Sequence, residues 1–100
     1  MIRPAVARNR IGPLLDQLII QLHGEGSATQ AAWFRRIRRS LDSAHDDFEV
    51  LIPIQALSTT QAVGFCFSED ADVLISRILE KAAELAAEFE FDQSSEGLKH

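Results

Sequence analysis

The 100-residue chain has a single cysteine and no long apolar run, and both shortages limit what the protein can be. Cys66 alone cannot form an intramolecular disulfide, which suits a reducing compartment. No stretch reaches the roughly 18 apolar residues of a membrane span. No apolar segment with a cleavage site follows the basic start MIRPAVARNR, as a signal peptide would require. We therefore expect a cytoplasmic protein without a membrane segment.

Motifs of catalysis and cofactor binding are also missing. The turn HGEGS follows no strand and precedes no Lys-Ser/Thr pair, so it is not a phosphate-binding loop. The spacing of His45, Asp46 and Asp47 matches no known set of metal ligands, and we expect a helix C-terminus with local side-chain hydrogen bonds there. The hydroxyls of residues 58–60 have no candidate base in the sequence. The sequence predicts a protein that is not an enzyme and holds no cofactor or metal.

The composition is that of an ordinary globular domain, but its charge is unevenly distributed. The chain is 46% apolar and 25% charged, as folded domains commonly are. Residues 1–40 hold seven basic and two acidic side chains, whereas residues 41–100 hold three basic and thirteen acidic ones. Such asymmetry indicates a nucleic-acid surface or two parts of one fold that attract each other. For a single small domain we favour the second interpretation.

Residues 1–91 are predicted to form one domain, with residues 1–11 as a loosely ordered arm and residues 92–100 as a frayed polar tail. A first helix begins at Pro13, because the first helical position needs no N–H. Gly24 suits the left-handed residue after its end. Helical spacing places Ile20 outside the apolar face of this helix, which comprises Leu14, Leu15, Leu18, Ile19 and Leu22.

A second helix is predicted from Ser27 to about Ser43. Ser27 and Gln30 have the spacing of a capping box. Helical periodicity separates an apolar side, made of Trp33, Phe34, Ile37 and Leu41, from a basic side, made of Arg35, Arg36, Arg38 and Arg39. The tryptophan therefore does not stand among the arginines, and this pattern is typical of an amphipathic helix with a solvated basic face.

The middle of the chain alternates apolar and other residues. Phe48, Val50, Ile52 and Ile54 form one alternating set, and Val63, Phe65 and Phe67 form another. A period of two favours two strands joined by a loop near residues 56–61, and Pro53 would place the first strand at an edge. The alternative is a short helix that starts at Pro53 and makes the protein all-helical.

The last helix is predicted from about Asp70 to Phe89. Ser68 can cap it, and acidic residues follow at the positive end of the helix dipole. Its apolar stripe comprises Leu74, Ile75, Ile78, Leu79, Ala82, Leu85, Ala86 and Phe89. We therefore expect an α+β fold of order α-α-β-β-α, with three amphipathic helices and a central two-stranded antiparallel hairpin. A small all-α bundle is the alternative.

The predicted hairpin is apolar on both faces, and such strands need cover on both sides. Our main hypothesis is a small non-catalytic protein–protein interaction module that self-associates, most simply as a twofold homodimer. The candidate interface residues are Ile20, Leu51, Ile52, Ile54, Phe65 and Phe67. Cys66, which lies between two phenylalanines, is interpreted as a small buried hydrophobe.

Two alternative functions follow from the charges. Arg35, Arg36, Arg38 and Arg39 are candidate anion-binding residues, and on one helical face they could follow a nucleic-acid backbone. Glu80, Glu84 and Glu88 are spaced by one helical turn. They form a negative strip that could dock on a basic partner, as an acidic inhibitor or immunity-type protein would.

Overall fold

The computed structural model describes residues 3–98, and their side chains except those of residues 61–62 and 89–98. This part of the chain contains no strand. It forms four α-helices and one short 3-10 helix: α1 (Pro4–Gly24), α2 (Ala28–Ser43), α3 (Asp47–Ser58), η1 (Thr60–Val63) and α4 (Glu69–Leu98). The predicted α+β fold is therefore wrong, and the protein is the all-α alternative.

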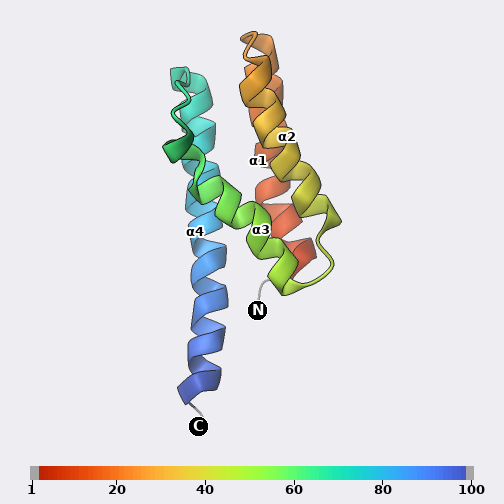
Figure 1. Cartoon of the computed structure of the whole chain (residues 1–100), viewed down its shortest axis with the longest axis vertical. Helices are drawn as coiled ribbons and strands as arrows, with labels where there is room; N and C mark the ends of the chain where they lie inside the picture. The colour runs from red at the N-terminus through yellow and green to blue at the C-terminus, as the bar shows by residue number, and fades with distance from the viewer. Residues whose placement is uncertain (1–2, 99–100) are drawn as a thin grey trace.

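The four helices are arranged as a ring in which each packs against two neighbours. α1 contacts α2 and α4, and α3 contacts the same two helices from the other side. Figure 1 shows α1 and α2 side by side, α3 crossing obliquely from α2 to α4, and α4 extending beyond the other helices at its C-terminal end. The molecule is accordingly elongated, with extents of 53 × 22 × 19 Å.

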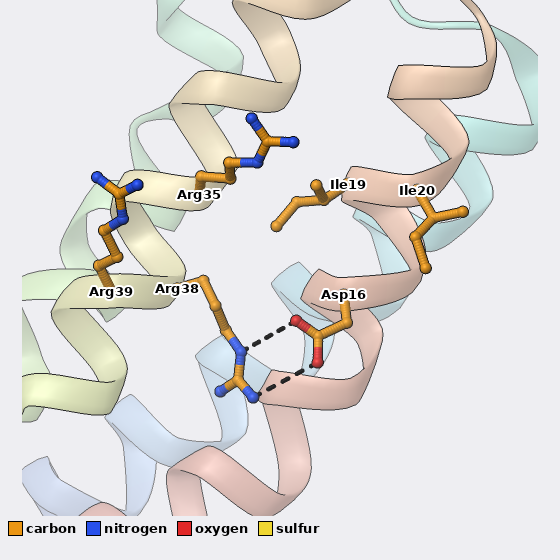
Figure 2. A pocket seen from close by; sticks show the side chains of 6 residues that line it. All are labelled: Asp16, Ile19, Ile20, Arg35, Arg38 and Arg39. Carbon is orange, nitrogen blue, oxygen red and sulfur yellow. Dashed lines mark hydrogen bonds and ion pairs between the residues drawn. The ribbon is translucent and has the colours of Figure 1, made fainter.

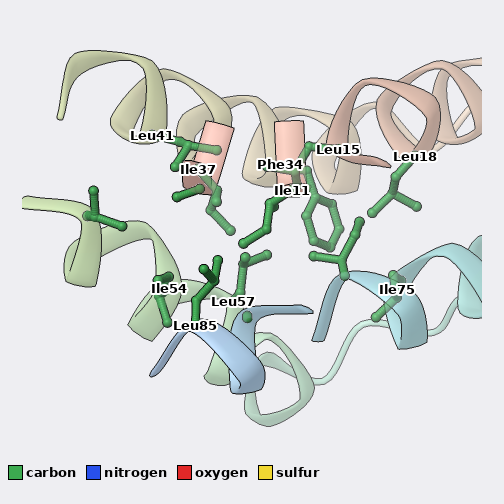
Figure 3. Packing of buried hydrophobic residues seen from close by; sticks show 14 of the residues in the cluster. Ile11, Leu15, Leu18, Phe34, Ile37, Leu41, Ile54, Leu57, Ile75 and Leu85 are labelled. Carbon is green, nitrogen blue, oxygen red and sulfur yellow. The ribbon is translucent and has the colours of Figure 1, made fainter. Parts of the chain in front are cut away.

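The core lies inside this ring and is built from the apolar faces that the sequence predicts for α1, α2 and α4. Figure 3 shows side chains of α1 and α2 meeting those of α3 and α4 across the centre. The largest fully buried side chains are Phe34, Ile11, Leu15, Leu18, Leu22, Leu41, Leu57, Ile78, Leu85, Val50 and Thr60. The predicted stripe of α4 is confirmed up to Ala86, and the side chain of Phe89 lies outside the described part.

Residues 47–58 form a helix because helical spacing, and not alternation, separates their buried from their exposed side chains. Val50, Ile54 and Leu57 are buried, whereas Ile52 is 61% exposed. The Asp46 side chain caps the helix by accepting a 2.8 Å hydrogen bond from the Glu49 N–H. Acidic residues in the first turn add a favourable interaction with the helix dipole. These local signals outweigh the cost of a proline inside the helix.

The predicted second strand consists of the end of η1 and the irregular chain that follows it. Phe65 and Phe67 are half-buried, while Cys66 is exposed, so the alternation of burial is correct but the strand is not. Gln30 holds this segment to α2 by donating from Nε2 to the Cys66 carbonyl at 2.9 Å. Gln30 therefore does not complete a capping box, and Ser27 makes no side-chain cap. The interpretation of Cys66 as a buried hydrophobe is also wrong.

Helix α1 begins nine residues before the predicted start. Pro4, and not Pro13, occupies the first helical position, and Ala7 and Ile11, from the predicted arm, are buried in the core. The left-handed residue after the helix is Gly26, with φ of 78°, and not Gly24. Hydrogen bonds from Gly26 N–H to the His23 carbonyl and from Ser27 N–H to the Leu22 carbonyl complete a Schellman motif there. The predicted polar tail falls on residues whose side chains are not described.

The start of α4 gives a direct test of capping. The Ser68 hydroxyl accepts a 3.1 Å hydrogen bond from the Ala71 N–H, which confirms the predicted cap. We expect Ser68→Ala to lower the free energy of unfolding by about 1 kcal/mol. The matched control is Ser27→Ala, which removes a hydroxyl that makes no cap and should cost less than about 0.5 kcal/mol. Urea denaturation measures the loss in both variants, and equal losses would contradict the assignment of Ser68 as the N-cap of α4.

Candidate functional site

The candidate interface residues do not form one surface. Ile54 is only 2% exposed and belongs to the core, and Leu51 is half-buried against it. Phe65 and Phe67 are half-buried, and their rings pack edge-on with centroids 5.9 Å apart. Only Ile20 (72% exposed) and Ile52 project clearly from the molecule. Each lines a groove, and the two grooves lie on opposite sides of α2.

The α2–α3 groove is predominantly apolar. It has a volume of about 230 Å³ and is lined by Trp33, Arg36, Ile37, Ser40, Ile52, Pro53 and Ala56. A smaller hollow of about 170 Å³ also has Trp33 and Arg36 in its lining. Arg36 is exposed and makes no ion pair with any side chain that the structure describes. The groove therefore combines apolar walls with one uncompensated positive charge.

Trp33 forms a fixed wall of this groove. Its indole Nε1 donates to the Thr60 hydroxyl at 3.2 Å, and that hydroxyl donates in turn to the Ala56 carbonyl at 3.2 Å. The ring of Phe65 packs against it in a T-shaped arrangement, with centroids 6.0 Å apart. Thr60 is buried, so it holds the indole through a hydrogen bond that is shielded from water. Helical periodicity predicts Trp33 on the apolar face of α2, but it does not reveal that the indole borders a groove.

The α1–α2 groove contains three of the four candidate anion-binding arginines. It has a volume of about 380 Å³ and is lined by Asp16, Ile19, Ile20, Arg35, Arg38 and Arg39. Figure 2 shows Arg35 and Arg38 on α2 extending toward Ile19 and Asp16 on α1, with Arg39 and Ile20 farther apart at the two sides. Arg36 is on the opposite side of α2. The four arginines are thus divided between two surfaces.

Arg38 is already neutralised within the chain. Its Nε donates to Asp16 at 3.1 Å, and its Nη1 donates to Asp42 at 2.8 Å. The guanidinium lies over the buried backbone of Gly12, where an added Cβ would come within 2.5 Å of Nη1. A side chain at this position would displace the arginine head from its contact with the backbone of α1. Neither Asp16 nor Gly12 was identified as a site residue from the sequence.

Arg35 and Arg39 keep their charge uncompensated. Arg35 contacts the ring nitrogen Nε2 of His23, and Arg39 makes no ion pair among the side chains described. The two arginines are separated by one helical turn, where like charges destabilise a helix by a few tenths of a kcal/mol. An anion bound between them would relieve this repulsion. The predicted role of all four arginines with nucleic acid stays a prediction.

The predicted acidic strip on α4 is partly compensated. Glu88 pairs with Arg10 of α1 at 3.2 Å, and Glu84 lies 3.6 Å from Lys81. Glu80 is exposed and forms no ion pair within the described part. Docking of this strip on a basic partner stays a prediction.

Glu25 joins the end of α1 to the start of α4. Its Oε2 accepts hydrogen bonds from Gln21 Nε2 at 2.7 Å and from the Ser68 hydroxyl at 2.5 Å. Both bonds favour the ionised form, so they lower the pKa of the Glu25 carboxyl below its ordinary value. The bond from Gln21 has the larger effect. The predicted turn at HGEGS therefore also provides a contact to α4, which the sequence analysis missed.

The lowered pKa of Glu25 gives a pH-dependent prediction. Its contribution to the free energy of unfolding is fully present above the pKa of the unfolded chain and is lost as the pH falls through the lower folded pKa. We expect wild type to have a higher Tm than Glu25→Gln near neutral pH, and this difference to shrink at about pH 3. Thermal denaturation at both pH values measures it. A difference that does not change with pH would contradict this role for Glu25.

The residues that the structure describes contain no candidate metal cluster and no candidate membrane span. No three His, Cys, Asp or Glu side chains there lie close enough together to hold a metal ion. Within the same residues, no helix has the length and apolar character needed to cross a bilayer. Asp46 makes the expected local hydrogen bond, but it caps the N-terminus of α3, so the predicted helix C-terminus at this position is wrong.

Comparison of the chain with protein-family models, with curated proteins and with solved structures found no match.

Proposed function

We propose that the protein is a non-catalytic protein–protein interaction module that self-associates through its α2–α3 groove. The observation that carries this proposal is Ile52, a large apolar side chain that is 61% exposed at the edge of an apolar groove. Full burial of an isoleucine side chain contributes roughly 1.5–3 kcal/mol. The proposal keeps the predicted role of the central segment but assigns it to the outer face of α3, since Ile54 is in the core.

A second copy of the chain is the partner that this surface fits best. The projecting side chain and the groove that could receive one lie on the same face. A twofold axis through that face would place Ile52 of each copy against the groove of the other, so that both contacts form at once. Arg36 and Ser40 border the apolar walls, and a polar rim around an apolar centre is typical of protein interfaces.

The test compares two substitutions that each replace an exposed isoleucine by glutamate. Ile52→Glu should convert a dimer into a monomer of 11.1 kDa, as measured by sedimentation velocity at micromolar concentration. The matched control Ile20→Glu adds the same charge to an even more exposed isoleucine beyond the proposed interface, and it should remain dimeric. Circular dichroism checks that both variants keep their helices. A wild type that stays monomeric, or an Ile20→Glu variant that also dissociates, would overturn the proposal.

A further inference from the structure

The α1–α2 groove carries a second inference, which is independent of the proposed self-association because it concerns the other side of α2. We propose that this groove binds a small amphipathic anion, in which a phosphate or carboxylate group is joined to a short apolar chain. The anionic group would lie between Arg35 and Arg39, and the apolar chain would lie along Ile19 and Ile20. The volume of about 380 Å³ falls in the range of small-molecule sites.

The charge of the groove supports an anionic ligand. The Arg38–Asp16–Asp42 network holds one positive and two negative charges, so the positive charge of the groove comes from Arg35 and Arg39. Both guanidinium groups belong to one wall of the groove, and Arg35 reaches toward α1 in Figure 2. A guanidinium has five N–H donors in a planar fork that matches the oxygens of a phosphate or carboxylate. Arg35 therefore retains donors beyond the one directed at His23.

The opposite wall explains why the ligand should be amphipathic. Ile20 is 72% exposed, the largest exposed fraction among the large apolar side chains that project from the described surface. Ile19 is half-buried and packs on the core, and both isoleucines line the groove on the side of α1. A purely inorganic anion would leave this wall in water, whereas an alkyl chain would cover it and gain free energy from burial.

Nucleic acid fits these residues less well. A polyanion gains affinity from each phosphate that it brings to a basic side chain. Arg36 faces away from the groove and Arg38 is paired with two carboxylates, so one backbone would meet only two uncompensated charges. An exposed isoleucine wall beside those charges adds nothing to phosphate-backbone binding. The groove is better matched to a ligand that is short and partly apolar.

The experiment titrates the full chain with hexyl phosphate, inorganic phosphate and hexanol, and follows backbone amide shifts by NMR. We expect hexyl phosphate to bind most tightly and to shift residues 16–20 and 35–39. Arg35→Gln with Arg39→Gln should weaken binding about tenfold or more, since two charge-assisted contacts are lost. The matched control, Arg3→Gln with Arg77→Gln, removes equal charge outside both grooves and should leave the affinity unchanged. Ile20→Ser should reduce hexyl phosphate to the affinity of inorganic phosphate.

A second experiment measures binding to vesicles that contain an anionic phospholipid, and it distinguishes a soluble ligand from a lipid headgroup. Binding of the free alkyl phosphate alone assigns a soluble ligand, and binding of both free and vesicle forms assigns a lipid headgroup. Either result supports the site if the Arg35/Arg39 double variant weakens it. Equal affinity for hexyl and inorganic phosphate, shifts confined to the α2–α3 groove, or tighter binding of a short DNA duplex that hexyl phosphate does not displace would each overturn the proposal.

Discussion

Replacing Ile54 with aspartate is expected to unfold the protein, whereas the same replacement at Ile52 is expected to leave it folded. Ile54 is 2% exposed inside the helical ring, and Ile52 is 61% exposed. A buried aspartate loses the transfer free energy of isoleucine and also places a carboxyl group without a partner in an apolar environment. We expect a loss of roughly 4 kcal/mol or more, which is most of the stability of a small domain.

The pair of substitutions separates a helix from a strand in the middle of the chain. In the predicted hairpin Ile52 and Ile54 lie on one face, so both replacements would cost similar amounts. In α3 they lie about 200° apart around the helix axis, and Ile52→Asp should change the free energy of unfolding by less than about 0.5 kcal/mol. Urea denaturation measures both changes, at protein concentrations low enough to keep the chain monomeric. Similar losses for the two variants would contradict the helical assignment.

The second large effect is expected for Phe34→Ala. Phe34 is 1% exposed and lies in the centre of the core, with its ring 6.0 Å from that of Phe67. Truncation leaves a cavity where α2 meets residues 65–67, and the surrounding helices can close it only in part. We expect the free energy of unfolding to fall by about 3–5 kcal/mol.

The control for this truncation is Val73→Ala on α4. Val73 is 53% exposed, so its loss creates no cavity and should change the stability by less than about 0.5 kcal/mol. Thermal or urea denaturation compares the two variants with wild type. A cost below about 1 kcal/mol for Phe34→Ala would show that this part of the core is loosely packed, contrary to the structure.

The sequence predicts the structure correctly where a single local period is present. In α1, α2 and α4 the apolar residues recur at helical spacing, and their predicted faces are the buried ones. The segment that becomes α3 contains both periods, because apolar residues occupy nearly every position from Phe48 to Ile54. The alternating set is more conspicuous, yet Val50, Ile54 and Leu57 also satisfy helical spacing. The Asp46 cap and the acidic first turn favour the helix, and they decide between the two periods.

The grooves could be predicted only in part. A helical wheel separates the arginines from the apolar face of α2, but it does not show which neighbouring helix borders each side. That depends on the packing of α1 and α3, which places Arg36 on one side and Arg35, Arg38 and Arg39 on the other. The partner of Arg38 is likewise hidden, because Asp16 is 22 residues away in the sequence. The close approach at Gly12 follows from the same tertiary contact.

The ring order of the four helices also has a consequence for how the chain folds. Three of the four sides of the ring join helices that follow one another directly, and only the contact of α1 with α4 joins distant parts of the chain. Short loops lose little entropy when they close, so the first three contacts can form early and in succession. Contacts between helices that neighbour each other in sequence are local, and proteins rich in local contacts typically fold within microseconds to milliseconds. The final step is then the docking of α4 onto α1, which the contacts Glu25–Ser68 and Arg10–Glu88 secure at two separate points along the α1–α4 interface.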